Sequence, residues 1–169
     1  TGDWVSRYPE AIKKIVSYGH ELGSHGDNHK HMSQLSPLEN QTELSGCFDK
    51  VKSLTGLSMN LFRAPYGDYN EALIQTAKEQ GYYTIQWNVD SLDWKDYGVS
   101  SIINTVINHK NLKPGSIILL HNGSTYTKDA LDSLLTQLEE KGYTFCLISD
   151  LIYKENYTID QAGEQHPLA

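Results

Sequence analysis

The stretch Ser36–Gly67, SPLENQTELSGCFDKVKSLTGLSMNLFRAPYG, contains the best-marked helix of this 169-residue chain and the strand that follows it. Ser36, Pro37 and Glu39 form the pattern of a capping box with proline in the first turn, which predicts the start of a helix. The apolar residues at helical spacing predict one buried stripe: Leu44, Phe48, Val51 and Leu54. Gly56 predicts the end of the helix, because glycine readily adopts the left-handed conformation found there.

A short apolar strand is predicted after this helix, and the same alternation runs along most of the chain. Residues 59–62 form the strand candidate and lead directly into Arg63. Further helices are predicted near residues 9–18, 70–80, 100–107 and 128–141, and further strands at 21–24, 83–89, 116–120 and 143–148. Helices that alternate with short apolar strands are typical of a parallel sheet wrapped by helices. The sequence therefore predicts an α/β fold, with the sheet either open or closed into a barrel.

Polar residues whose side chains can take part in catalysis or metal binding follow four of the predicted strands. His25, Arg63, Asp90 and His121 each come just after the carboxyl end of a strand candidate. That end of the strands is where α/β barrels and open α/β sheets keep their active sites. A requirement for packing alone does not predict this distribution, so we expect a functional site there.

His25 and His29 stand four residues apart in the segment Gly23–His29, GSHGDNH. In a helical turn this spacing aims both imidazoles at one point, and imidazole suits zinc and similar divalent ions. A catalytic zinc usually takes three protein ligands and a water, so the pair needs a third ligand from elsewhere. The alternative is a pair of structural histidines held by hydrogen bonds, and His20 and His31 lie close by.

Charge and hydropathy argue against nucleic-acid binding and against a membrane-spanning segment. Fourteen Lys and Arg residues stand against 21 Asp and Glu residues, a formal net charge of −7, and no basic run could follow a phosphate backbone. Nucleic acid is therefore not expected as a partner. No apolar run approaches the ~18 residues of a membrane span, so none is predicted.

The length of the chain suits one domain with a sizeable core. We predict a single catalytic domain over residues 1–153 and a polar tail over residues 154–169, which we expect to be partly disordered. The opening residues Thr1–Trp4 read as the interior of a longer chain, which predicts strands upstream. Cys47 and Cys146 both fall in apolar patterns and are interpreted as small core residues.

Four segments, in this order, resemble the motifs of the polysaccharide deacetylase family, also called the NodB-homology domain or carbohydrate esterase family 4. They are His25–His29, Arg63–Tyr66, Asp90–Trp94 and Leu119–His121. The resemblance extends from about Thr1 to Tyr153. It implies the distorted (β/α) barrel of that family, here without its N-terminal strand or strands.

Two departures from the family pattern matter. Gly26 stands where the family usually has Ser or Thr, whose hydroxyl braces the loop, and Asp27 with Asn28 is the alternative brace. The family's first motif, of the type Thr-Phe-Asp-Asp, would lie upstream of Thr1. Because that motif supplies the general base and the third metal ligand, the resemblance implies that both come from upstream, either in the same protein or as a separate N-terminal fragment.

The resemblance assigns metal and acid roles. His25 and His29 are implied ligands of a divalent cation, with zinc favoured and cobalt or a similar ion as the alternative. His121 is the implied general acid, since imidazole can protonate a leaving amine near neutral pH. Asp93, and with less support Asp90, is implied to hold that histidine, and the simpler reading of either aspartate is a cap or loop brace.

The resemblance implies three roles for the other site residues: keeping the base ionised, donating to the oxyanion and contacting the substrate. Arg63 is implied to keep the base ionised, the alternative being a surface salt bridge, and Tyr66 to offer its backbone N–H to the oxyanion. Substrate contacts are implied for Pro65 and Asp90. Trp94 and Leu119 are implied to line an acetyl pocket, although such residues beside a strand are usually core.

The resemblance implies a hydrolase that removes N-acetyl, or alternatively O-acetyl, groups from a polysaccharide such as peptidoglycan or chitin. It acts on carbon–nitrogen bonds other than peptide bonds, and it is secreted or held at the cell surface, although no signal region is visible in this chain. One alternative is a catalytically inactive glycan-binding relative. The other is a metal-dependent amidohydrolase acting on a small molecule.

Overall fold

The computed structural model describes residues 1–168, and residue contacts divide them into two compact units. The first unit contains Thr1–Gln86 together with the residues from Leu147 onward, and the second contains Trp87–Cys146. Each unit has its own hydrophobic core. No helix within residues 1–168 is both long and apolar enough to cross a membrane.

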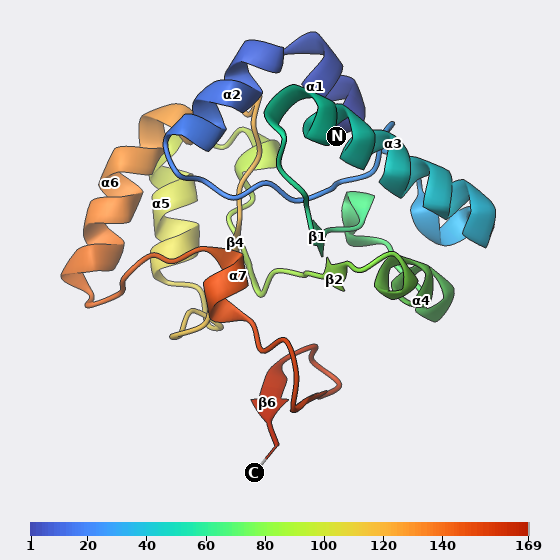
Figure 1. The fold of residues 1–169 in the computed structure, drawn as a ribbon. Coiled ribbons are helices and arrows are strands. Elements are labelled where there is room, and N and C mark those ends of the chain that lie inside the picture. The colour runs from blue at the N-terminus through green and yellow to red at the C-terminus, as the bar shows by residue number, and fades with distance from the viewer. Residues whose placement is uncertain (169) are drawn as a thin grey trace. The chain divides into compact units, whose positions relative to one another are not determined.

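The first unit is mainly helical (Figure 1). Its helices are α1 (Gly2–Arg7), α2 (Pro9–Ser17), α3 (Pro37–Thr55), α4 (Glu71–Glu79) and α7 (Ile148–Leu151), with 3₁₀ turns η1 (Met32–Gln34) and η2 (Pro65–Gly67). The capping box predicted for α3 is confirmed: the Ser36 hydroxyl accepts from the Glu39 amide, and the Glu39 carboxylate accepts from the Ser36 amide. Gly56 ends the helix in the left-handed conformation, with φ of 75°.

Two short parallel strands run through the first unit. β1 (Leu61–Phe62) pairs with β2 (Tyr83–Thr84), and Ser24 forms a parallel bridge to Phe62 on the other side of β1. Backbone hydrogen bonds fix this arrangement, because Ser24 donates to the Leu61 carbonyl and accepts from the Arg63 amide. The residues that follow Ser24 and Phe62 therefore leave the sheet at the same end.

The core of the first unit lies beneath the apolar faces of its helices. Its buried members are Val5, Ile12, Met32, Leu44, Cys47, Val51, Met59, Phe62, Ala64, Leu73, Ala77 and Tyr82. Helix α3 contributes Leu44, Cys47 and Val51 from one stripe, as the spacing predicted. Burial of this stripe fixes which face of α3 turns toward the loop that contains the histidine pair.

The second unit combines two strands with two long helices. Strands β3 (Val89–Asp90) and β4 (Ile118–Leu119) are parallel, and α5 (Val99–Ile107) packs against α6 (Thr127–Glu140) (Figure 1). The 3₁₀ turn η3 (Asp93–Lys95) follows β3 closely. Asp90 pairs with Leu119, so the segments that follow the two strands emerge side by side.

Two predictions in the region 143–148 are wrong. Residues 143–147 form no strand, and Ile148 begins the short helix α7. An apolar run becomes a strand only where a neighbouring strand accepts its hydrogen bonds, and no strand of the described chain pairs with this run. Cys146 is consequently exposed, whereas Cys47 is buried as predicted.

The C-terminal tail and one helix face also differ from expectation. Strands β5 (Tyr157–Ile159) and β6 (Gln165–Pro167) form an antiparallel hairpin in the segment that we expected to be partly disordered. Asp160 in the connecting turn accepts backbone hydrogen bonds from Ala162 and Glu164, which a count of apolar residues does not reveal. In α4, the spacing of Leu73, Ile74 and Ala77 predicts that all three face inward; Leu73 and Ala77 are buried, but Ile74 is 37% exposed.

Candidate active site

His25 is placed and oriented by the end of the sheet. Its Nδ1 donates a hydrogen bond to the Arg63 carbonyl oxygen at 2.6 Å, across the parallel pairing of Ser24 with β1. Because Nδ1 is engaged, Nε2 is the nitrogen left to bind a metal, as is common for metal-binding histidines. Burial lowers the pKa of His25 to about 4. The imidazole is therefore neutral at pH 7, which is the form that coordinates a metal.

His29 completes a pair of imidazoles that fits one divalent ion. The ring centroids of His25 and His29 lie 4.9 Å apart with the rings nearly perpendicular. Burial also lowers the pKa of His29, so it too favours the neutral form. Two neutral imidazoles suit zinc or a similar ion. Within residues 1–168 no group of three or more His, Cys, Asp or Glu side chains is placed to hold a metal, so the pair accounts for only part of a coordination shell.

The loop between the two histidines, residues 25–29, is called the histidine loop below. Its backbone carbonyls are held by the first turn of α1: the Gly2 amide donates to Gly26 at 3.1 Å, and the Asp3 amide donates to Asp27 at 2.9 Å. These bonds satisfy N–H groups that a helix start otherwise leaves without partners.

The Asp27 side chain fits a slot between two glycines. Its carboxylate pairs with the Lys50 ammonium at 2.6 Å. A Cβ atom on Gly2 would overlap the Asp27 carboxylate, and one on Gly46 would lie 2.9 Å from Asp27 Cγ. Both glycines are therefore needed for the carboxylate to reach Lys50.

The loop amides are held by Glu43, a residue of α3 that is 2% exposed. Its Oε2 accepts from the amides of Asp27 at 3.0 Å and Asn28 at 2.7 Å. Its Oε1 accepts from Asn28 Nδ2 at 3.0 Å and from Lys30 Nζ at 2.9 Å. Burial alone would raise the pKa of Glu43, but these hydrogen bonds outweigh it and lower the pKa. Glu43 is therefore a carboxylate near neutral pH.

Gly26 is required by this arrangement. Its φ is 74°, which disfavours any residue with a side chain, and a Cβ there would lie 3.2 Å from Met32 Sδ and 3.4 Å from Glu43 Oε2. The Ser or Thr usual in the family would be strained by this φ and would crowd Met32 in this conformation. We predicted that Asp27 and Asn28 would brace this loop in place of the missing hydroxyl. In the structure the Glu43 carboxylate holds most of it.

Arg63 and Tyr66 lie beside the histidine pair. Burial lowers the pKa of Arg63 from its ordinary value, although a guanidinium stays protonated at neutral pH. The Tyr66 ring lies 4.5 Å from the His29 ring and stacks on His31 at 4.0 Å. Pro65 is buried directly before it.

Strained backbone conformations occur in both units, in or near the segments that contain predicted site residues. Within residues 1–168, five residues other than glycine have positive φ: His29, Tyr66, Leu92, Asp96 and Asn156. Four of the five lie in or next to the segments that contain the site residues. Such conformations cost about 1–3 kcal/mol each and persist where the surrounding structure holds them.

The second unit holds the other predicted side chains around a buried carboxylate. Asp93 is fully buried, and its Oδ1 accepts from His121 Nδ1 at 2.7 Å. Its Oδ2 accepts from the His121 amide and from the Thr127 hydroxyl, both at 2.7 Å. Burial would raise the pKa of Asp93, but the hydrogen bonds from Thr127 and His121 outweigh it and lower the pKa. Asp93 thus remains ionised and fixes the orientation of the His121 ring.

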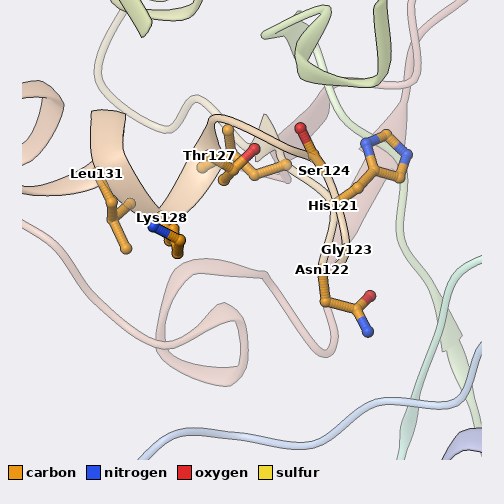
Figure 2. Close-up of a pocket in the computed structure, with 8 residues that line it drawn as sticks. His121, Asn122, Gly123, Ser124, Thr127, Lys128 and Leu131 are labelled. Atoms are coloured by element: carbon orange, nitrogen blue, oxygen red, sulfur yellow. The ribbon is translucent and has the colours of Figure 1, made fainter. Parts of the chain in front are cut away.

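An open cavity of about 490 Å³ lies beside His121. Figure 2 shows His121, Asn122, Gly123 and Ser124 along one segment, and Thr127, Lys128 and Leu131 along the neighbouring helix. The Ser124 hydroxyl donates to the Asp93 carbonyl at 2.8 Å and ties this segment to η3. The cavity is lined by the polar side chains of His121, Asn122, Ser124, Thr127 and Lys128 together with Leu120 and Leu131.

The remaining predicted site residues have mixed placements. Asp90 accepts a hydrogen bond from the Leu92 amide at 2.9 Å, so it braces the turn after β3. Leu119 is 4% exposed and is not among the residues that line the cavity, whereas Leu120 is. Trp94 is 55% exposed. The substrate contacts of Asp90, Leu119, Trp94 and Pro65 stay predictions.

The structure brings His25, His29, Arg63 and Tyr66 together in the first unit, and Asp90, Asp93 and His121 together in the second. Sequence reasoning missed Glu43 and Thr127. A signal for Glu43 existed, because the buried stripe of α3 continues backward from Leu44 onto Glu43 and Asn40. A charged residue in a buried stripe indicates a specific partner.

Comparisons with known proteins identify the family of this chain. Residues 1–85 match the sequence model of the family described as polysaccharide deacetylase. A peptidoglycan-N-acetylglucosamine deacetylase of Bacillus cereus is 41% identical over 158 residues, which cover 88% of this chain and 70% of that protein. A peptidoglycan-N-acetylmuramic acid deacetylase of Bacillus subtilis is 34% identical over 159 residues, covering 92% and 60%. The chain therefore belongs to the polysaccharide deacetylase family.

Solved structures confirm the predicted α/β fold of the polysaccharide deacetylase type. A CE4 family pseudoenzyme of Bacillus anthracis is similar with a TM-score of 0.84 and 30% identity, over 89% of this chain and 53% of that one. A family 4 carbohydrate esterase of Streptomyces lividans, solved with acetate, has a TM-score of 0.83 and 26% identity, over 100% and 81%. This chain spans 60–70% of the length of the two curated relatives.

Proposed function

We propose that the protein is a metal-dependent hydrolase that removes N-acetyl groups, or alternatively O-acetyl groups, from a polysaccharide of the peptidoglycan or chitin type. Family membership supports this proposal, as do the relatives named peptidoglycan deacetylases. Because peptidoglycan lies outside the cell membrane, the proposal places the protein at the cell surface or in the surroundings of the cell.

The observation that supports the proposal most strongly is the pair formed by His121 and Asp93, called the acid dyad below. Burying a carboxylate completely is costly unless it is paired and hydrogen-bonded. The Asp93 carboxylate accepts three hydrogen bonds, two of them from His121. Here the carboxylate accepts from Nδ1 of the imidazole, which leaves Nε2 to deliver a proton. Amide hydrolysis needs such a donor, because an amine leaves only when protonated.

His25 and His29 are proposed to hold the metal through their free ring nitrogens, and the neutral state of both rings supports this. A bound divalent cation would polarise the acetyl carbonyl and make a bound water more acidic. The Arg63 carbonyl fixes the His25 ring, and the half-buried Arg63 guanidinium is proposed to keep a carboxylate base ionised. The general base that this chemistry also requires is assigned to no residue of the described chain.

Tyr66 and the apolar residues are proposed to handle the acetyl group. The strained turn at Tyr66 would aim its backbone N–H at the developing oxyanion, a contribution of ~3 kcal/mol for one donor. Trp94 and Leu119 are proposed to contact the acetyl methyl group. Pro65 and Asp90 are proposed to shape the adjoining surface.

Acetate release from N-acetylated peptidoglycan fragments or chito-oligosaccharides tests the proposal. We expect the whole protein to release acetate with zinc or cobalt present, to lose this activity on chelation, and to recover it when the ion returns. His25→Ala should abolish both metal binding and acetate release. His20→Ala is the matched control, since His20 is exposed in the same unit. Full activity after chelation, or in His25→Ala, would refute the metal-dependent mechanism.

The similarity to a CE4 family pseudoenzyme favours a second candidate, a glycan-binding protein without turnover. The same assay separates the two functions if glycan affinity is measured alongside acetate release. Tight glycan binding by a metal-loaded protein that releases no acetate would establish the binding function instead.

A further inference from the structure

The histidine loop is braced from two sides. On one side the first turn of α1 donates to the carbonyls of Gly26 and Asp27. On the other side α3 accepts from the next amides, those of Asp27 and Asn28, through a single buried carboxylate. Four backbone groups between the two histidines, namely two carbonyls and two amides, thus have protein partners that involve no metal.

We propose that Glu43 is a positioning residue for metal binding, which sets the separation of His25 and His29 by holding the backbone amides between them. This inference rests on the proposed function, because it concerns the metal half of that site. Glu43 touches neither the metal nor the substrate in this proposal. It acts through the loop.

Three features distinguish Glu43 from an ordinary buried ion pair. Its two oxygens accept four hydrogen bonds, of which three come from the histidine loop and one from Lys30. Lys30 is 52% exposed and screened by water, so the pair with Lys30 alone does not explain why the carboxylate is buried. Hydrogen bonds to a charged acceptor are also stronger than neutral ones.

The position of Glu43 on α3 makes the brace rigid. Glu43 directly precedes Leu44, which is 0% exposed in the core, and one turn later the same stripe is buried at Cys47. The side chain therefore starts from a fixed backbone. Supporting residues of this kind typically change metal affinity by about 10- to 100-fold when they are removed.

Zinc affinity, measured by competition with a chelator in the whole protein, tests this inference. We expect Glu43→Ala to weaken zinc binding by about 10- to 100-fold. Glu43→Gln should restore most of the affinity, because its amide oxygen can still accept from both loop amides. Glu39→Ala is the matched control: it removes the Glu39 carboxylate from the capping box at the start of the same helix, but it should leave zinc affinity unchanged.

Hydrogen exchange gives a second readout that does not depend on how the alanine variant folds. In the wild-type protein the amides of Asp27 and Asn28 should be protected, and in Glu43→Gln they should stay protected. Fast exchange at both amides in the wild-type protein would overturn the inference. So would zinc affinity in Glu43→Ala equal to wild type, or a loss in Glu39→Ala as large as that in Glu43→Ala.

These measurements separate this inference from the proposed function, because none of them uses a substrate. A wild-type protein that binds zinc through a Glu43-dependent loop and yet releases no acetate would refute deacetylation and support the positioning role. Zinc binding that is indifferent to Glu43 in an active deacetylase would refute the positioning role alone. A wild-type protein that binds no divalent ion would refute both.

Discussion

Replacing His121 by alanine is expected to lower the rate of acetate release by roughly 10²- to 10⁴-fold, the range typical of a lost general acid. The ring is held by Asp93 through Nδ1, and the substitution removes Nε2, the nitrogen proposed to donate the proton. Zinc affinity should be unchanged, because the metal histidines belong to the first unit. The rate of acetate release and the zinc dissociation constant of the purified variant are the measurements.

His109→Ala is the matched control for this prediction. His109 lies in the same unit, is similarly half-buried and has its Nδ1 hydrogen-bonded, in this case to the Asn111 amide. It should retain full turnover. Loss of zinc from His121→Ala, or turnover within a few-fold of wild type, would contradict the role assigned to His121.

Replacing Asp93 by asparagine is expected to lower turnover by a similar factor, roughly 10²- to 10⁴-fold, for a different reason. Asparagine can keep its oxygen toward the His121 amide and the Thr127 hydroxyl, but its NH₂ group then faces His121 Nδ1. The imidazole must change tautomer, and its protonated form loses the charge that stabilised it. Thr127→Val, which removes only one hydrogen bond to Asp93, should reduce turnover much less.

The same substitution has a signature in the pH dependence of stability. The pKa of Asp93 lies below its ordinary value of 3.8, because hydrogen bonds from Thr127 and His121 outweigh burial. The unfolded chain therefore takes up this proton at a higher pH than the folded protein does. The stabilisation is present above pH ~4 and is lost as the pH falls below it, toward the folded pKa.

Chemical denaturation of the wild-type protein and Asp93→Asn at pH 6 and pH 3 measures this effect. The wild-type protein should be the more stable at pH 6, and the difference in unfolding free energy should shrink at pH 3. A difference that is constant, or that grows in acid, would show that the carboxylate is not stabilised in the folded state.

Features set by neighbouring residues could be predicted from the sequence. The capping box at Ser36 and Glu39 and the left-handed Gly56 both depend on contacts within one turn, and both are confirmed. Arg63 and His121 follow short strands as predicted, whereas Asp90 is itself the last residue of β3, and the strand predicted at residues 21–24 before His25 is only an isolated bridge at Ser24. The strands themselves are shorter than predicted, because pairing across the sheet decides where each one ends.

Features that depend on distant partners could not be predicted. Residues 143–147 have the composition of a strand, yet no strand of the described chain pairs with them. Glu43 lies 15 and 16 residues from the amides that it binds, so no local pattern connects them. The bond from Thr127 to Asp93 spans 34 residues, and a threonine at the start of a helix has a simpler explanation as a cap.

We propose that the histidine loop presents two neutral imidazoles, those of His25 and His29, to one divalent ion. Anomalous X-ray diffraction from crystals of the zinc-loaded protein tests it most directly. We expect a single strong peak about 2.0–2.1 Å from Nε2 of His25 and from a ring nitrogen of His29, with His25 Nδ1 still bound to the Arg63 carbonyl. A peak elsewhere, or zinc bound through Nδ1 of His25, would contradict it.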